Sequence, residues 1–269
     1  MAGLGAVLAA ALWLAATGNG GIRYSADHGD TVPMWTRWIP ALVGIALIRL
    51  VPPRTDPRWP DPVAPYREAV PLLLAGIAFA AVLPLLGGEP AYTVGKLALL
   101  LGVPAVVFLA ARRRPPRWRP GPDPTGAAYR WGPALPVAGW LVLSYATPLA
   151  VPASDWGRTV TPAELIATIL VAFAVNALLE EVFYRRWLQT RWESLLGRWP
   201  AVVLASLVWA VWHVTIQGTG RLGTDLAAVV VNQGVLGLFL GYLWSRYRRM
   251  WPLLVVHGAV NAVPILLGL

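Results

Sequence analysis

Long apolar runs follow one another along the whole chain, and they restrict the chain to a membrane fold. Nine such segments are separated by polar, Pro-rich or Arg-containing stretches: residues 1–17, 35–51, 70–87, 92–111, 132–151, 162–184, 199–216, 226–244 and 251–269. About 20 apolar residues are enough to cross a bilayer as a helix. Backbone in lipid must satisfy its own hydrogen bonds, so each run should be helical. The sequence therefore predicts an all-α fold, a polytopic transmembrane helical bundle of about eight or nine helices.

The composition agrees with a membrane protein. Only 13% of the residues are charged and 57% are hydrophobic, whereas a soluble domain has about 25% charged residues. Cysteine is absent, which excludes disulfides and thiolate chemistry. The segment 1–17 is expected to be a first transmembrane helix rather than a signal peptide, because it has no basic residue before Arg23.

Basic residues indicate the orientation of the chain in the membrane. The net charge is +9, but most of the Arg residues lie in four alternate connections, within residues 49–67, 112–130, 185–198 and 246–249. Because cytoplasmic loops are enriched in Lys and Arg, the N-terminus is expected in the cytoplasm, and the cytoplasmic membrane is the expected location. This explanation of the charge leaves no reason to expect nucleic acid as a partner. Lys96, the single lysine, is expected near the outer end of its segment.

Four ionisable side chains interrupt the apolar segments. They are Glu180, Glu181, His213 and His257, whereas His28 lies in a polar loop. Ionisable groups inside the bilayer are costly and usually functional. Residues four apart share a helix face, and four pairs have this spacing: Asn176 with Glu180, Glu181 with Arg185, Trp209 with His213, and His257 with Asn261.

Counting across one turn predicts which of these residues meet. Gly197 is expected to end one helix and begin a hairpin. Glu180 and His213 lie at almost equal distances on either side of it, each about 25 Å from the turn. Glu180 and His213 are therefore expected to lie level, which requires the sixth helix to continue to about residue 195. The same count does not place His257.

Structural explanations exist for each residue taken alone. Glu181 and Arg185 can form an ion pair within one helix, and a single histidine is often a hydrogen-bonded packing residue. Asn261, Asn232 and Gln233 can hold helices together. A buried glutamate, two histidines and an asparagine on three helices nevertheless point to a site.

Two kinds of chemistry fit this set. Glu180, His213 and His257 could ligate zinc or another divalent metal, with water in the open position. Alternatively, Glu180 and His213 could activate water without a metal, while His257 and Asn261 donate hydrogen bonds to the oxyanion. Both predict hydrolysis of an acyl bond.

Three motifs resemble those of a known family. Residues 180–185 read EEVFYR, an EExxxR motif; residues 209–213 read WAVWH, similar to FxxxH; and residues 257–261 read HGAVN, an HxxxN motif. Their order is similar to that in the CPBP family, the CAAX proteases and bacteriocin-processing enzymes also called Abi or type II CAAX proteases. The resemblance covers about residues 160–269. Residues 151–269 are expected to form the catalytic membrane region and residues 1–150 an N-terminal multi-helix region.

The resemblance implies an intramembrane endopeptidase, a metalloprotease by the family's common label. Glu180 and His213 would activate water, His257 and Asn261 would complete the site, and Glu181, Arg185 and Trp209 would support it. The substrate would be a membrane-associated protein or peptide, possibly lipidated, and the lipid bilayer the other partner. Two other readings stay open, namely a catalytically silent immunity or scaffold protein of the same fold and a small-solute transporter.

Overall fold

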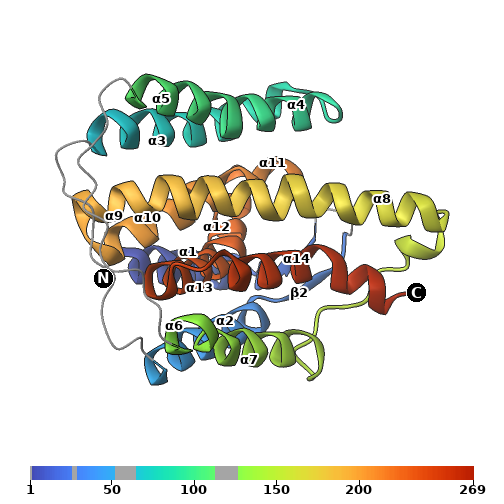
Figure 1. Ribbon diagram of the computed structural model, residues 1–269. Coiled ribbons are helices and arrows are strands. Elements are labelled where there is room, and N and C mark those ends of the chain that lie inside the picture. The colour runs from blue at the N-terminus through green and yellow to red at the C-terminus, as the bar shows by residue number, and fades with distance from the viewer. Residues whose placement is uncertain (1, 26–28, 52–64, 113–126) are drawn as a thin grey trace.

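The computed structural model describes residues 2–25, 29–51, 65–112 and 127–269. It is a bundle of nearly parallel and antiparallel helices (Figure 1). The predicted Pro-rich loops and His28 lie mostly outside the described residues. Every predicted apolar segment falls on a helix or on a run of consecutive helical elements, which confirms the all-α fold. The elements are α1 (Ala2–Ala16), α2 (Met34–Leu50), α3 (Pro65–Val82) with η1 (Leu83–Leu85), α4 (Ala91–Leu97) with η2 (Ala98–Gly102) and α5 (Val103–Arg112), α6 (Ala127–Trp131), α7 (Ala134–Tyr145), η3 (Trp156–Arg158), α8 (Pro162–Ala172) with η4 (Phe173–Leu178), η5 (Glu181–Gln189) and α9 (Thr190–Leu196), α10 (Arg198–Val211), α11 (His213–Gln217), α12 (Leu222–Val229) with η6 (Val230–Gly234) and α13 (Val235–Tyr247), and α14 (Met250–Leu267).

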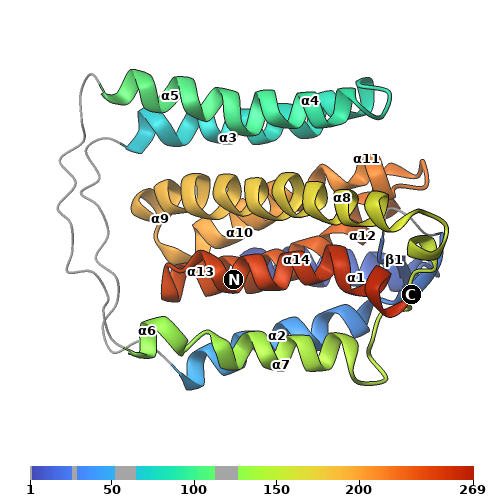
Figure 2. The same cartoon turned by 45° about the vertical axis from the view of Figure 1, so that its right-hand side comes forward.

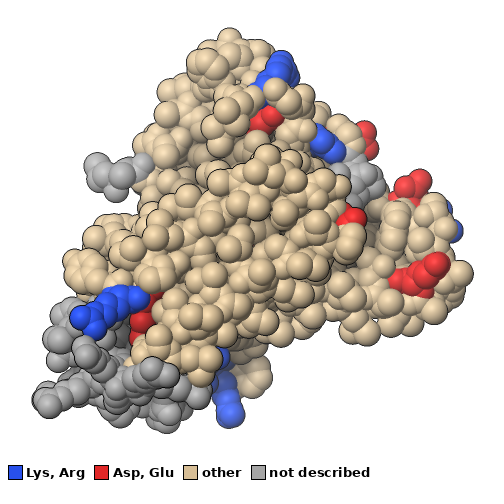
Figure 3. Space-filling model, turned by 90° about the horizontal axis from the view of Figure 1, so that it is seen from above, with Lys and Arg blue, Asp and Glu red and all other residues tan. Residues whose placement is uncertain are grey.

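Six of these helical stretches are long and apolar enough to span a membrane: Tyr66–Leu85, Ala91–Ala111, Pro162–Leu196, Arg198–Gln217, Leu222–Tyr247 and Met250–Leu267. Gly5–Ala16 and Ala134–Tyr145 are shorter apolar helices. Figure 3 shows a broad face without charged side chains, with the charges lying toward its edges. Large apolar side chains are exposed on the outside of the bundle, as lipid contact requires; they include Leu12, Leu74, Val106, Leu109, Ile166 and Leu170.

The bundle is layered around the α12–α13 stretch. This stretch is the most enclosed of the six, with 78% of its most apolar window buried. α10 and α2 pack against α13, and α7 packs against α2. The hairpin of α3 and α4–α5 lies on the other side of the α8–α9 helix (Figures 1 and 2). The hairpin of α3 and α4–α5 therefore packs against the long α8–α9 helix, and α3 also contacts α10.

A small β-hairpin departs from the purely helical expectation. β1 (Gly21–Arg23) and β2 (Thr31–Pro33) pair antiparallel, with Ile22 opposite Val32. Both side chains are at least 91% buried, so the hairpin covers one end of the bundle. Each strand has only three residues and one buried apolar position, so the sequence is too short there to show the alternation that is typical of a strand.

Turns of π-helix, in which hydrogen bonds close five residues apart, interrupt the helices near the unusual polar residues. η2 follows Lys96, η4 contains Asn176, η5 begins at Glu181 and η6 contains Asn232. Such turns change which side chains share a helix face, and they are frequent at functional sites. They mark the segments of the bundle where the polar side chains are presented.

The predicted hairpin at Gly197 is confirmed. The helix from Pro162 continues to Leu196, and α10 begins at Arg198. Gly197 itself has φ 80° and ψ 174°, a backbone conformation open almost only to glycine. The predicted extension of the sixth helix is therefore correct.

Candidate active site

The carboxylate of Glu180 lies at the centre of a buried polar cluster and is only 1% exposed. Its Oε1 is paired with the Lys96 ammonium, and its Oε2 accepts a hydrogen bond from the Trp209 indole. His213 and His257 lie close enough to interact with it electrostatically. The sequence predicted that Glu180 has no partner on its own helix and that His213 is its partner. The structure brings Glu180 and His213 together, but the side chains that contact the Glu180 carboxylate directly are those of Lys96 and Trp209.

Lys96 is the site residue that sequence reasoning missed. The prediction placed it near an outer end of its segment, whereas the structure buries it completely. Its Nζ donates to Glu180, to Asn176 Oδ1 at 2.7 Å and to Tyr92 Oη at 2.9 Å. One signal in the sequence could have found it: Lys96 is the only lysine in a chain whose other basic residues are all arginine.

Trp209 connects the members of the cluster. Its ring lies edge-on to both histidines, with centroids 5.0 Å from His213 and 5.5 Å from His257. Its indole N–H donates to Glu180, and the Arg185 guanidinium lies 5.2 Å from its ring. Trp209 is 2% exposed, so its bulk sets the spacing between the two imidazoles.

His213 is held through one of its two ring nitrogens. Its Nδ1 lies 3.0 Å from the Trp209 carbonyl oxygen. Because a carbonyl only accepts, Nδ1 carries the hydrogen, and Nε2 of the neutral ring is left as an acceptor. The ring stacks on Trp212 at a centroid distance of 3.8 Å. His213 is thereby oriented to accept a proton.

His257 is oriented by the second glutamate of the pair. Its Nδ1 lies 2.8 Å from Glu181 Oε1, and the ring is 4% exposed. A carboxylate against Nδ1 fixes the ring and leaves Nε2 for another partner. Glu181 on η5 therefore supports His257 on α14, and it also pairs with Arg185 on its own helix.

The depth of His257, which counting from Gly197 did not give, follows from another anchor. Arg248, between α13 and α14, donates to Thr190 at 3.4 Å and is ion-paired with Glu193. Nine residues separate Thr190 from Glu181, and nine separate Arg248 from His257. The α13–α14 connection therefore lies beside Thr190, about two helical turns closer to Glu181 than Gly197 is. His257 is consequently level with Glu181.

The predicted ion pair between Glu181 and Arg185 is present. Both side chains are 0% exposed, and Arg185 Nε lies 3.4 Å from Glu181 Oε2. None of the three guanidinium nitrogens has a hydrogen-bond partner among the described residues. Arg185 therefore acts through its charge and its contact with Trp209. The neighbouring Arg186 is exposed, as expected for a residue at the membrane surface.

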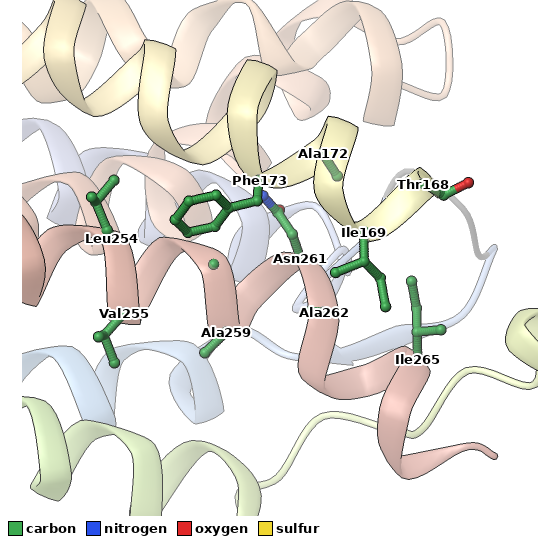
Figure 4. Close-up of a pocket in the computed structure, with 11 residues that line it drawn as sticks. Thr168, Ile169, Ala172, Phe173, Leu254, Val255, Ala259, Asn261, Ala262 and Ile265 are labelled. Carbon is green, nitrogen blue, oxygen red and sulfur yellow. The ribbon is translucent and has the colours of Figure 1, made fainter. Parts of the chain in front are cut away.

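Asn261 lies beside this cluster on a groove between α8 and α14. The groove has a volume of about 290 Å³ and is lined mainly by apolar side chains, among them Ile169, Phe173 and Ala262. Figure 4 shows Asn261 reaching from α14 toward α8 beside Phe173. Its Nδ2 has no hydrogen-bond partner among the described residues. The structure therefore leaves a buried N–H donor available in a groove between two membrane-spanning helices.

The two remaining predicted polar residues hold helices together, as expected. Asn232 accepts from Arg37 Nε at 3.3 Å, and Gln233 donates to Gln217 at 2.6 Å. These contacts join α2, α11 and η6 and do not involve Glu180. Asn232 and Gln233 thus belong to the packing of the bundle.

The described residues do not form a ready metal site. Among them, no group of three His, Cys, Asp or Glu side chains is gathered closely enough to hold a metal ion. The Lys96 ammonium is already paired with Glu180 and would repel a second cation at this carboxylate, so the set Glu180, His213 and His257 does not fit a metal ion in this arrangement. The metal-dependent alternative stays a prediction for metal analysis of the purified protein.

Comparison with known proteins supports the resemblance seen in the motifs. The family model described as type II CAAX prenyl endopeptidase Rce1-like matches residues 162–263. Comparisons with curated proteins and with solved structures found no match. The matched residues contain the candidate site except Lys96, Tyr92 and their helix. The match over residues 162–263 therefore supports the resemblance to the CAAX protease family that the three motifs carry.

Proposed function

We propose that this integral membrane protein is an intramembrane endopeptidase that hydrolyses a peptide bond of a membrane-associated protein or peptide. The observation that carries the proposal is the pair of oriented imidazoles, His213 and His257, flanking Trp209 next to the Glu180 carboxylate. A carboxylate and a histidine acceptor together can bind both protons of one water. The family match, to a protease family, gives the reaction class.

In the proposed mechanism Glu180 and His213 Nε2 accept hydrogen bonds from the two O–H groups of the attacking water. Glu180 takes one proton as the water oxygen adds to the scissile carbonyl carbon, and later delivers it to the leaving amine. His257, held by Glu181 through Nδ1, contributes a hydrogen bond from its Nε2 side to the carbonyl oxygen as that oxygen becomes negative. Asn261 Nδ2 donates to the same oxygen. The acyl bond breaks when the tetrahedral intermediate collapses and expels the amine.

The groove between α8 and α14 supports a substrate that arrives from the membrane. It is apolar, lies between two membrane-spanning helices and is lined in part by Asn261, whose Nδ2 has no hydrogen-bond partner among the described residues. An extended CAAX-like segment, with or without a lipid group, would place its apolar portion there. A catalytically silent scaffold or a transporter would have no need of a free donor beside two oriented histidines.

The test is cleavage of a fluorogenic membrane-peptide library by the purified protein in lipid nanodiscs. Wild type should cleave at least one peptide, and Glu180→Gln and His213→Gln should abolish cleavage. Glu68→Gln is the matched control, because Glu68 is also a buried glutamate in an ion pair but pairs with Arg191 and does not contact the site. If wild type and Glu180→Gln are equally inactive while a cellular phenotype survives the substitution, the proposal fails. Metal analysis and chelator treatment of the active protein separate the two mechanisms.

The proposed orientation, with the N-terminus in the cytoplasm, can be tested by cysteine labelling because the chain contains no cysteine. Thr17 and Tyr66 are both exposed; Thr17 directly follows α1, and Tyr66 is the second residue of α3, at the other end of the next predicted membrane crossing. A membrane-impermeant maleimide added to intact cells should label Thr17→Cys and should not label Tyr66→Cys. The reverse pattern would contradict the orientation.

A further inference from the structure

Lys96 reaches the candidate site from outside the part of the chain that matches the protease family. It lies on α4, whereas the family match covers residues 162–263. α4 continues through η2 into α5, and this helix packs with α3 as a hairpin against the long α8–α9 helix (Figures 1 and 2). The N-terminal region thus supplies a charge to the carboxylate at the centre of the site.

The Lys96 ammonium has a hydrogen-bond acceptor for each of its N–H groups. A lysine has three N–H donors, and Lys96 directs them to three separate oxygens, on Glu180, Asn176 and Tyr92. Asn176 lies one turn before Glu180 on the same helix, so the lysine contacts two residues of one face. An ammonium with three oxygen partners, 0% exposed, is an ordered component of the site.

Lys96 also touches the histidine side of the cluster. Its Nζ lies 4.9 Å from the centroid of the Trp212 ring, within the range of a cation–π interaction. Trp212 in turn stacks on His213 at 3.8 Å. One side chain therefore contacts the carboxylate directly and the ring that supports the imidazole.

We infer that Lys96 is a positioning residue of the site, which holds the Glu180 carboxylate in its working orientation and balances its charge inside the membrane. An ionised carboxylate offers about four acceptor positions. Lys96 and Trp209 occupy one on each oxygen, which leaves positions for the water. An unbalanced carboxylate would be costly at this depth. This inference rests on the proposed peptidase function and assigns a part in it to the N-terminal hairpin.

The test compares two ion pairs that join the same hairpin to the same helix. Lys96 pairs with Glu180, and Glu68 on α3 pairs with Arg191 on η5–α9. Lys96→Met should lower kcat on the order of 100-fold, as removal of a preorganised electrostatic partner does, with KM unchanged. Glu68→Gln should keep both constants, because Glu68 does not contact the site.

Two results overturn the inference while the peptidase function stands. One is a wild-type kcat in Lys96→Met. The other is an equal loss of kcat in Glu68→Gln, which would mean that Lys96 serves only to dock the hairpin. If Lys96→Met does not fold, Asn176→Ala decides. It removes one oxygen that holds Nζ and should lower kcat about tenfold at constant KM, and an unchanged kcat overturns the inference.

A third measurement does not require activity. Lys96→Met leaves the Glu180 charge buried and unpaired, so its melting temperature should fall, and adding Glu180→Gln should recover most of the loss. Failure of the double variant to recover contradicts the charge-balancing role. Complete inactivity of the wild-type protein, in contrast, counts against the peptidase proposal itself.

Discussion

Replacing Arg185 by methionine should strongly destabilise the bundle. Arg185 and Glu181 are both 0% exposed, and their charges lie 3.4 Å apart. Methionine fills much of the space of the arginine stem but leaves Glu181 without a compensating cation on its own helix. His257 then stays as the partner of Glu181.

The distance between the Arg185 and Glu181 charges sets the size of the expected destabilisation. At 3.4 Å and an effective dielectric constant of about 20, two unit charges attract by about 5 kcal/mol. None of the guanidinium nitrogens of Arg185 has a hydrogen bond to the part of the chain that the structure describes, so little must be added for lost hydrogen bonds. Breaking a buried pair by removing one partner costs about 3–5 kcal/mol. A loss of this size should lower the melting temperature by roughly 10 °C.

Intrinsic fluorescence of the 15 Trp residues during thermal unfolding in nanodiscs provides the assay. Arg186→Met is the matched control, since Arg186 is the next residue and is exposed; it should unfold as wild type does. The double variant Glu181→Gln with Arg185→Met removes both charges and should recover most of the stability. Equal melting temperatures for Arg185→Met and Arg186→Met, or a double variant as unstable as the single one, would refute the reasoning.

Three further predictions concern the site and its frame. Trp209→Phe removes the indole donor to Glu180 but keeps an aromatic ring between the histidines, so the free energy of unfolding should fall by about 1.5–3 kcal/mol; thermal unfolding identical to wild type would argue against this hydrogen bond. Ala262→Leu places a larger side chain in the groove and should raise KM more than it lowers kcat; steady-state kinetics with an unchanged KM would remove the groove from the substrate path. Gly197→Ala should cost about 1–3 kcal/mol because of its positive φ, whereas Gly5→Ala, which also has open space around its Cβ position but helical backbone, should cost nothing in the same unfolding measurement.

Local sequence spacing was sufficient for the features that depend on one helix or one turn. The apolar runs predicted the helices correctly, because a backbone surrounded by lipid must satisfy its own hydrogen bonds. Glu181 and Arg185, four residues apart, form the expected pair. Gly197 ends the long helix where expected, and equal arms on either side bring Glu180 and His213 into the same cluster.

The partners of Glu180 and the depth of His257 were decided only by tertiary structure. Lys96 is 84 residues from Glu180 in the chain, and no periodicity within either helix relates the two. His257 becomes level with Glu181 because Arg248 is anchored at Thr190 and Glu193. A residue count along one helix measures depth from that helix's own turn, but it carries no information on where neighbouring turns lie. Ion pairs and packing between helices set those relative depths, and the charge that faces Glu180 depends on them.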